Sequence, residues 1–302
     1  MKQLVILSGK GGTGKTTVAA ALAHLLSQTQ QLVLVDADVD APNLGLIIDA
    51  PAGIDPAHDD TPTWADPFYG GKQATLDQSL CIGCGRCAEV CRFDAIVQAN
   101  GSYAVETIAC EGCAACYYAC PSGAITMRDA LSGYWFTRET RFGPLVQARL
   151  LPGEENSGKL VSRIRQEGLA VAAERNADWI VIDGSPGIGC PVIAAVTGAD
   201  LALLVAEATV SGVHDLRRAN EVVEHFQLGA AVCINKSDLN QELTDEIGRY
   251  CAERDVPVMA RLPYDETVLE AMQAGVPVTE LADNPVGRAM HEIAAALCPV
   301  TE

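Results

Sequence analysis

Two cysteine runs of the same spacing stand close together in this chain of 302 residues. The runs are Cys81-x2-Cys84-x2-Cys87-x3-Cys91 and Cys110-x2-Cys113-x2-Cys116-x3-Cys120, and a proline follows the second run. Each cysteine of the second run lies 29 residues after its counterpart in the first, which indicates an internal duplication. Three thiolates at this spacing can surround one face of an iron–sulfur cube. The fourth cysteine of each run lies too far along the chain to bind the same cluster, so it binds the cluster of the other run.

A loop rich in glycine and lysine lies near the start of the chain, at residues 9–17 (GKGGTGKTT). Its pattern Gly9-x4-Gly14-Lys15-Thr16 follows a short apolar run and precedes a run rich in Ala and Leu, which is the context of a phosphate-binding loop. Glycines allow backbone N–H groups to converge on phosphate oxygens, and a helix N-terminus adds partial positive charge. We therefore expect Lys15 to reach the β- and γ-phosphates and the Thr16 hydroxyl to bind Mg²⁺.

Strands and helices alternate in the parts of the chain that must position these motifs. The expected strands are 2–7, 32–35, 179–182, 201–205, 231–234 and 256–260, and the expected helices include 18–26, 213–226, 245–254 and 285–297. Between about residues 49 and 134 the alternation stops, and Pro, Gly, Asp and Cys dominate. In that stretch Asn100-Gly101 indicates a hairpin turn.

The fold class predicted from this pattern is α/β, a parallel-sheet P-loop NTPase interrupted by a small α+β insert. The predicted boundaries are residues 1–48 and 136–302 for the NTPase domain, 49–71 for a linker and 72–135 for the insert.

The composition excludes several classes of protein. Hydrophobic residues make up 49% of the chain, which excludes a disordered protein. Lys and Arg total 21 against 39 Asp and Glu, and the resulting charge of −18 predicts no nucleic-acid partner. No apolar run approaches ~20 residues, so we expect no membrane insertion. We expect a cytoplasmic protein, because the first apolar run leads into the glycine-rich loop instead of a cleavage site.

The cysteines outside the two runs are expected to be small buried hydrophobes: Cys190, Cys233, Cys251 and Cys298.

The complete loop resembles the deviant Walker A loop of the MinD/ParA/Mrp and nitrogenase iron-protein superfamily of ATPases. The resemblance implies that two nucleotides are sandwiched between two subunits and that hydrolysis depends on dimerisation. It implies catalytic roles for Lys10, Lys15 and Asp38, with Lys10 reaching the partner's phosphates and Asp38 orienting the attacking water. The implied Mg²⁺ ligands are Thr16, Asp38 and Asp183.

The same resemblance implies a set of residues that bind ATP or ADP: Gly9, Lys10, Gly11, Gly12, Thr13, Gly14, Lys15, Thr16, Thr17, Asn235, Pro263 and Asp265. Asn235 resembles the residue that reads the base, and Pro263 and Asp265 lie where the family closes an adenine pocket. An Asn-Lys-x-Asp motif alone would indicate guanine, as in Ras-like GTPases. The deviant loop favours adenine.

The insert resembles a bacterial two-cluster ferredoxin. This implies one [4Fe–4S] cluster on Cys81, Cys84, Cys87 and Cys120, and another on Cys91, Cys110, Cys113 and Cys116. Zinc is the alternative, but it favours two separated cysteine pairs per site. Arg92 stands where a ferredoxin has proline, and a cation beside the Cys91 thiolate is expected to favour the reduced cluster.

The whole chain resembles MinD/Mrp-type ATPases that carry a ferredoxin insert. This implies that nucleotide-dependent rearrangement of a homodimer, or of a heterodimer with a paralogue, gates electron transfer for a metalloprotein or metallocofactor. A NifX or orange-protein type of protein is an expected partner. An Mrp-like iron–sulfur carrier and a MinD/ParA-like positioning switch stay open as alternatives. The carrier is weakened by the absence of a C-terminal Cys-x-x-Cys.

Two features between the insert and Asp183 also stand out. Arg138 and Arg141 are either surface charges or a link between the insert and the nucleotide site. The segment 154–159 includes Ser157-Gly158-Lys159, which indicates the start of a capped helix and leaves open a coupling role after the insert.

Overall fold

The computed structural model describes residues 1–48, 65–99, 101–154 and 157–298. The chain divides into a larger unit (residues 1–65, 135–149 and 157–302) and a cysteine unit (residues 66–134 and 150–156). The expected linker ended at residue 71, but its last six residues begin a long strand, β3 (Asp66–Leu76). Residues 49–64 of that linker lie outside the described residues.

The larger unit is built on a mostly parallel sheet, as the sequence predicted. The whole sheet has the strand order β11-β10-β9-β1-β8-β2-β7-β6-β3, of which β3 belongs to the cysteine unit and β6 (Ile125–Thr140) to both units. Neighbours from β11 to β7 pair in parallel. The strands are β1 (Lys2–Ser8), β2 (Leu32–Asp36), β7 (Gly143–Leu150), β8 (Trp179–Pro186), β9 (Leu201–Glu207), β10 (Gly229–Asn235) and β11 (Val258–Arg261). Their near-continuous apolar sequences follow from burial on both faces.

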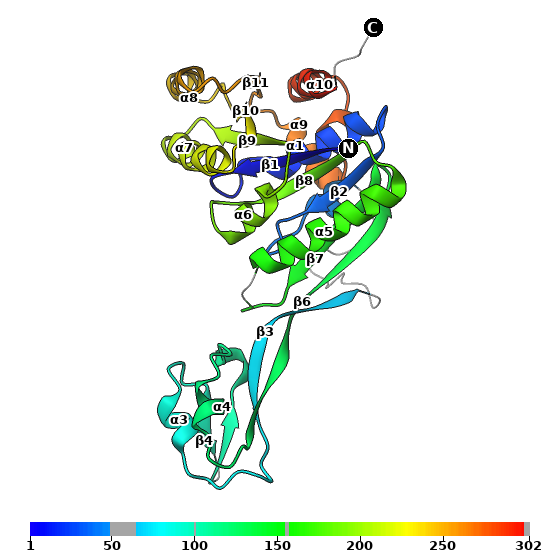
Figure 1. Ribbon diagram of the computed structural model, residues 1–302. Coiled ribbons are helices and arrows are strands. Elements are labelled where there is room, and N and C mark those ends of the chain that lie inside the picture. The colour runs from blue at the N-terminus through cyan, green and yellow to red at the C-terminus, as the bar shows by residue number, and fades with distance from the viewer. Residues whose placement is uncertain (49–64, 100, 155–156, 299–302) are drawn as a thin grey trace. The chain divides into compact units, whose positions relative to one another are not determined.

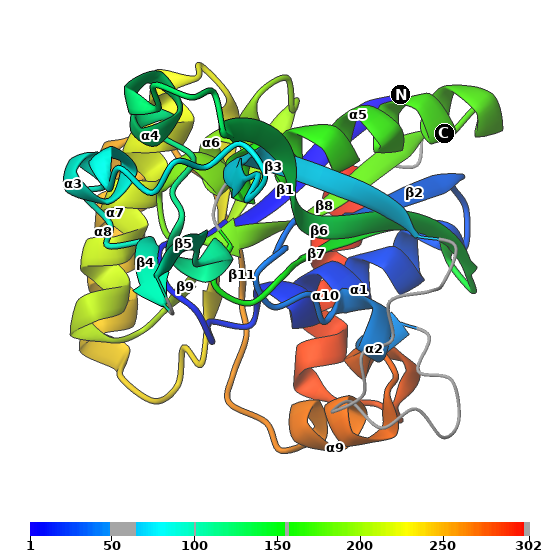
Figure 2. The same cartoon turned by 90° about the horizontal axis from the view of Figure 1, so that it is seen from below.

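Helices cover both faces of this sheet, α1 and α10 on one and α5 and α6 on the other (Figures 1 and 2). Alternation along the strands explains the two layers: Leu4 and Ile6 pack in the cluster that contains α1 and α10, whereas Val35 packs against Gly168 of α5. The helices are α1 (Lys15–Ser27), α2 (Leu44–Ile48), α5 (Ser157–Arg175), α6 (Cys190–Val196), α7 (Val210–His225), α8 (Gln241–Glu253), α9 (Thr267–Ala274) and α10 (Pro285–Leu297), with a 3₁₀ turn at Val278–Glu280. The expected helix beginning near Ser157 is confirmed as α5.

The cysteine unit consists of short elements around two loops. After β3 come α3 (Arg86–Val90), β4 (Ile96–Ala99), β5 (Ser102–Val105), a 3₁₀ turn (Thr107–Ala109), α4 (Ala115–Ala119) and β6 (Ile125–Thr140). Strands β4 and β5 pair in antiparallel, with Ala99 opposite Ser102, so the predicted hairpin is present. Of its two turn residues, Asn100 lies outside the described residues and Gly101 has a φ of 82°.

The internal duplication is repeated in the backbone of the cysteine unit. Residues 29 positions apart share the left-handed conformation, in the pairs Gly83 and Gly112 (φ 67° and 64°), Gly85 and Ala114 (76° and 64°), and Asp94 and Gly123 (52° and 66°). The second pair directly precedes α3 and α4. One half therefore uses alanine at a position where the other half uses the glycine that this conformation favours.

Strand β6 was not predicted from the sequence. It belongs to both units, because residues 125–134 lie in the cysteine unit and residues 135–140 in the larger unit. Its alternation of buried and exposed side chains is irregular, which removes the period-two signal.

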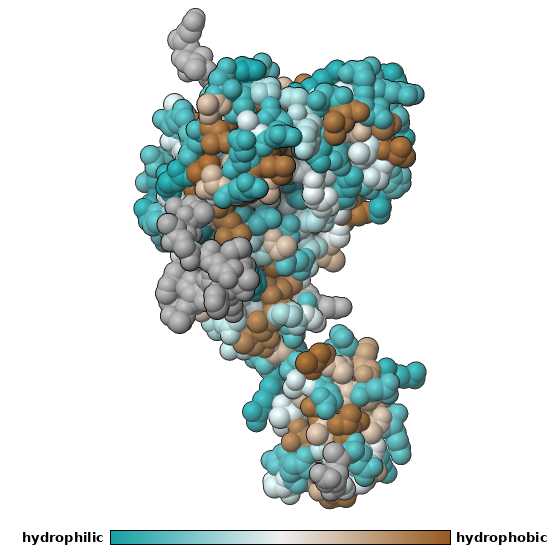
Figure 3. Space-filling model, turned by 180° about the vertical axis from the view of Figure 1, so that it is seen from behind, coloured by the Kyte–Doolittle hydropathy of each residue, from teal (hydrophilic) through white to brown (hydrophobic). Residues whose placement is uncertain are grey.

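The surface of the larger unit mixes hydrophilic and apolar residues (Figure 3). No helix among the described residues is long and apolar enough to span a membrane.

Candidate functional site

The glycine-rich loop is forced into its shape by its neighbours. Gly12 and Gly14 have φ angles of 75° and 95°, which side chains disfavour. A Cβ on Gly9 would lie 2.4 Å from the backbone oxygen of Asp215, and one on Gly14 would lie 2.5 Å from Nδ2 of Asn235. Close packing therefore requires glycine at both positions, and at Gly14 the backbone conformation requires it as well.

A hollow of about 1140 Å³, counted with its open mouth, adjoins this loop. Most of the predicted nucleotide-binding residues line it: Gly11, Gly12, Gly14, Lys15, Thr16, Thr17, Asp38, Asn235, Pro263 and Asp265. Gly9, Lys10, Thr13 and Asp183 are not among its lining residues. The lining also includes apolar side chains that were missed from the sequence: Ile47, Leu262, Val268, Leu269, Met272 and Val286. The hollow thus combines polar groups with an apolar surface, as in many ligand sites.

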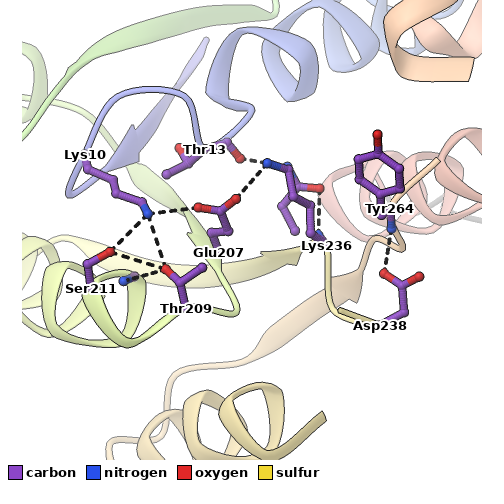
Figure 4. Close-up of polar contacts among 10 residues, drawn as sticks. Lys10, Thr13, Glu207, Thr209, Ser211, Lys236, Asp238 and Tyr264 are labelled. Carbon is purple, nitrogen blue, oxygen red and sulfur yellow. Dashed lines mark hydrogen bonds and ion pairs between the residues drawn. The ribbon is translucent and has the colours of Figure 1, made fainter. Parts of the chain in front are cut away.

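Lys10 points away from this hollow, into a cluster on β9 and α7 (Figure 4). Its Nζ lies 2.9 Å from Oε2 of Glu207 and donates hydrogen bonds to the hydroxyls of Thr209 (3.3 Å) and Ser211 (3.1 Å). The other oxygen of Glu207 accepts a hydrogen bond of 2.7 Å from Nζ of Lys236. Partial burial opposes ionisation of Glu207, but the bonds from Lys236 and Lys10 outweigh it and lower its pKa.

Three carboxyl groups gather where β2 ends beside β8. Asp36 and Asp183 are register partners on these neighbouring strands, and both are fully buried. Burial raises the pKa of Asp183 to about 7, although the nearby Thr16 hydroxyl and Lys15 oppose the shift. Burial and the adjacent Asp183 likewise raise the pKa of Asp36 well above its ordinary value. Among the described residues, neither oxygen of Asp183 has a well-formed hydrogen bond.

Asp38 lies two residues beyond Asp36, at the edge of the same site. Burial raises the pKa of Asp38, while Lys15 lowers it. The Asp36 carboxylate holds this loop in place, because its oxygens accept hydrogen bonds from the backbone N–H of Asp38 (3.2 Å) and Leu44 (3.0 Å). Sequence reasoning gave Asp36 no role; its place before Asp38 at the end of an apolar run was the signal.

The loop that carries Asp38 is hydrogen-bonded directly to the part of β8 that carries Asp183. The backbone N–H of Ala37 donates to the carbonyl of Asp183 (2.8 Å), and the Ser185 hydroxyl donates to the carbonyl of Ala37 (2.5 Å). A displacement of the Asp38 loop must therefore break or move its hydrogen bonds to β8.

The Asn235-Lys236-Ser237-Asp238 motif divides its side chains among different tasks. Nδ2 of Asn235 donates to the carbonyl of Thr13 (2.7 Å), so this side chain joins the motif to the glycine-rich loop. Asp238 is not among the residues lining the hollow, and it accepts a hydrogen bond from the backbone N–H of Tyr264 (2.7 Å; Figure 4). It thereby positions the segment that contains Pro263 and Asp265.

Two smaller hollows in the cysteine unit account for all eight cysteines of the runs. One is lined by Cys91, Cys110, Cys113 and Cys116, and the other by Cys81, Cys84, Cys87 and Cys120. Each hollow takes three cysteines from one run and the fourth from the other. Within the described ranges, no three His, Cys, Asp or Glu side chains lie close enough to hold a single metal ion.

The remaining cysteines differ in burial. Cys233 and Cys251 are buried as predicted, and burial raises the pKa of their thiols to about 12 and about 11. Cys190 is exposed, because it begins α6 at the surface, and Cys298 is half-buried. The prediction of four buried cysteines is thus wrong for Cys190 and holds only partly for Cys298.

The parallel sheet and the glycine-rich loop before α1 define an α/β protein of the P-loop nucleotide-binding class. The chain belongs to the family described as the CobQ/CobB/MinD/ParA nucleotide binding domain, which matches residues 4–278. The uncharacterized protein MJ0578 of Methanocaldococcus jannaschii is 36% identical over 238 residues, 79% of each chain. The septum site-determining protein MinD of Pyrococcus horikoshii, solved with Mg-ADP, has a similar fold, with a TM-score of 0.58 and 18% identity over 99% of this chain and 96% of that one.

Two further relatives have names that mention iron–sulfur proteins. The iron-sulfur cluster carrier protein of Pyrococcus horikoshii is 21% identical over 310 residues, 98% of this chain and 85% of the carrier. The uncharacterized ferredoxin MJ0265 of Methanocaldococcus jannaschii is 31% identical over 90 residues, 30% of this chain and 52% of that protein.

Proposed function

We propose that this protein hydrolyses ATP and couples nucleotide-dependent rearrangement of a dimer to electron transfer through two [4Fe–4S] clusters. The observation that carries the proposal is the grouping of eight cysteines into two hollows of four, in a chain that also contains the nucleotide hollow. The electron acceptor would be a metalloprotein or a protein that assembles a metallocofactor.

The nucleotide chemistry follows from the polar groups of the large hollow. Lys15 and the loop N–H groups would bind the phosphates, with Thr16 and Asp183 as the side chains suited to Mg²⁺. The unpaired oxygens of Asp183 fit this role, since a buried carboxylate needs a cation or a proton. Asp38, which lines the hollow and lies near Lys15, would orient the attacking water.

Adenine is the base that the geometry favours. Recognition of guanine by an Asn-Lys-x-Asp motif needs the aspartate in the base pocket, whereas Asp238 binds the backbone of Tyr264 outside it. The apolar wall formed by α9 would instead pack against the base.

Dimerisation would require Lys10 to leave its present partners. In the single chain Lys10 is held by Glu207, Thr209 and Ser211, so it cannot at the same time reach a nucleotide in another subunit. Its release would accompany formation of a dimer in which each subunit completes the site of the other.

The cysteines of each hollow are chemically suited to an iron–sulfur cluster. Thiolates are the ligands of such clusters, and glycine or alanine in the left-handed conformation between them lets the backbone turn around the hollow. A bound [4Fe–4S] cluster supplies one-electron transfer. Large apolar side chains near the cysteines are exposed, such as Ile108 (94%) and Tyr118 (83%), and they would contact a protein partner.

The cluster ligands can be tested by iron content of paired variants. Cys91→Ala should lose half of the bound iron, and adding Cys110→Ala should lose no more, because both cysteines line one hollow. Adding Cys81→Ala instead should lose the rest. If Cys91 instead shares a cluster with its own run, the double variant with Cys110→Ala loses all of the iron and the one with Cys81→Ala loses only half. That result would show that the assignment is wrong.

The coupling is tested by anaerobic EPR of the dithionite-reduced protein with and without MgATP. Asp38→Ala holds the ATP state, and Asp40→Ala is the matched control, because Asp40 is exposed in the same loop. We expect MgATP to change the cluster signal or its midpoint potential. An EPR signal and a midpoint potential that MgATP leaves unchanged in all three proteins would refute gated electron transfer. They would favour a positioning switch with structural clusters.

An iron–sulfur carrier is the second candidate, because a relative with that name aligns with 98% of this chain. A carrier must release a cluster to an apo-acceptor, whereas an electron-transfer protein must keep both. Transfer of iron from the chain to apo-ferredoxin in the presence of MgATP would favour the carrier.

A further inference from the structure

The short helix α2 forms part of two different environments in the larger unit. On one side, Ile47 and the preceding Asn43 line the nucleotide hollow together with Asp38. At the start of the helix, the N–H of Leu44 is held by the Asp36 carboxylate (3.0 Å). Any change in the Asp38 loop is therefore transmitted to α2 through a short, hydrogen-bonded segment.

Two arginines donate hydrogen bonds to carbonyl groups of α2. Nη2 of Arg138 donates to the carbonyl of Gly45 (3.0 Å), and Nε of Arg141 donates to the carbonyl of Ile48 (3.1 Å). Arg141 also pairs with Glu280 (2.9 Å). Hydrogen bonds from a charged donor are among the stronger ones in proteins.

The backbone of α2 at Gly45 is packed closely against the Arg138 side chain. A Cβ at that position would lie 2.5 Å from Nη2 of Arg138 and 2.9 Å from Oε1 of Gln147. The helix backbone thus rests directly on the side chains of β6 and β7, and a shift of α2 must move them.

Arg138 lies near one end of β6, and the other end of the same strand lines both cysteine hollows. Ile125 lines the hollow of Cys81, and Met127 lines the hollow of Cys91. A single strand therefore carries, along one backbone, the contact to the nucleotide wall and the contacts to both sets of cysteines.

We propose that Arg138 and Arg141 are positioning residues that couple α2, the wall of the nucleotide hollow, to β6 and thereby to the lining of the two cysteine hollows. Nucleotide binding moves the Asp38 loop, α2 follows through Leu44, and the two arginines pass the displacement to β6. The proposal rests on nucleotide binding in the large hollow and adds the route by which the cysteine unit detects it.

The test is amide hydrogen exchange of the full chain, measured by mass spectrometry with and without MgATP. In the wild type we expect MgATP to slow exchange in β6 peptides near Ile125 by about fivefold, at the low end of typical allosteric coupling. Arg138→Met and Arg141→Met should remove this response while residues 9–17 remain protected by MgATP. Arg138→Lys should restore part of it.

The matched control is Arg175→Met, which breaks an exposed ion pair to Glu139 on the same strand without touching α2. It should respond to MgATP as the wild type does. If β6 ignores MgATP in the wild type, or responds fully in both arginine variants, the proposal is overturned. If Arg138→Met also loses the protection of residues 9–17 by MgATP, the response of β6 in Arg141→Met is the test of the proposal. The Arg141 side chain is 44% exposed, so its replacement leaves the core intact.

EPR of the same samples separates this proposal from the proposed function. Exchange in β6 that depends on MgATP, with an EPR signal that does not, supports the coupling through Arg138 and Arg141 and refutes gated electron transfer.

Discussion

Replacing Asp183 by asparagine should change how stability depends on pH. The pKa of the Asp183 carboxyl is about 7 in the folded chain against an ordinary value of 3.8, because the group is fully buried. Above pH 7 its ionisation therefore costs the fold about 4 kcal/mol, since each pKa unit corresponds to about 1.4 kcal/mol. The cost is absent below the unfolded pKa, grows as the pH rises and is complete above the folded pKa.

The variant is most informative between about pH 5.5 and about pH 8.5, where the wild type should lose about 2 kcal/mol that Asp183→Asn keeps. In the larger unit this corresponds to roughly 4–8 °C in the midpoint of thermal unfolding. Tryptophan fluorescence reports the transition, since Trp179, one of three tryptophans, is 5% exposed on the same strand. The measurement is made without nucleotide or Mg²⁺, and Asp40→Asn, in an exposed position, is the control.

A difference between Asp183→Asn and wild type that is the same at both pH values would refute this reasoning. It would mean that the carboxylate is solvated or paired in solution. Its unsatisfied oxygens would then no longer argue for a cation at this position.

Three further predictions concern other parts of the chain. Glu207→Gln removes the ion pair of Lys10 and should strengthen MgATP-dependent dimerisation by up to about fivefold, the upper end of the range for such ion pairs. Sedimentation that shows no change contradicts this prediction. Ala114→Gly should stabilise the cysteine unit by about 1 kcal/mol and Gly83→Ala should destabilise it by the same amount, because both residues have the left-handed backbone conformation that glycine favours. The midpoints of urea unfolding test this prediction, and unchanged midpoints contradict it. Arg92→Pro should lower the reduction potential of the cluster beside Cys91 by less than about 60 mV. Equal potentials for wild type and variant in potentiometric titration would show that Arg92 does not tune this cluster.

Much of the nucleotide site could be predicted because its residues occupy contiguous motifs. The glycine-rich loop and the apolar run before Asp183 are local patterns, and the structure has a strand before the loop and a helix after it. The expected strand 179–182 is present as β8, which continues through Asp183 to Pro186. The hairpin at Gly101 was also predictable, since its turn chemistry lies within a few residues.

Features that depend on tertiary contacts could not be predicted. The partner of Lys10 is Glu207, nearly two hundred residues away in the chain, and no local pattern joins them. The part of α9 that lines the large hollow has an ordinary amphipathic sequence. Strand β6 lacks regular alternation because its two ends belong to different units with different buried faces.

The division of β6 between two units also sets an order of events during synthesis. The cysteine unit is nearly contiguous, with residues 66–134 as its main segment, whereas the larger unit needs β11, which ends at Arg261. At typical elongation rates the ribosome delivers β11 roughly 6–25 s after the cysteine unit is complete to residue 134. Under the proposed function, the thiols of both runs would therefore be available for metallation on the nascent chain before the sheet of the larger unit can close, and loading of metal would precede loading of nucleotide.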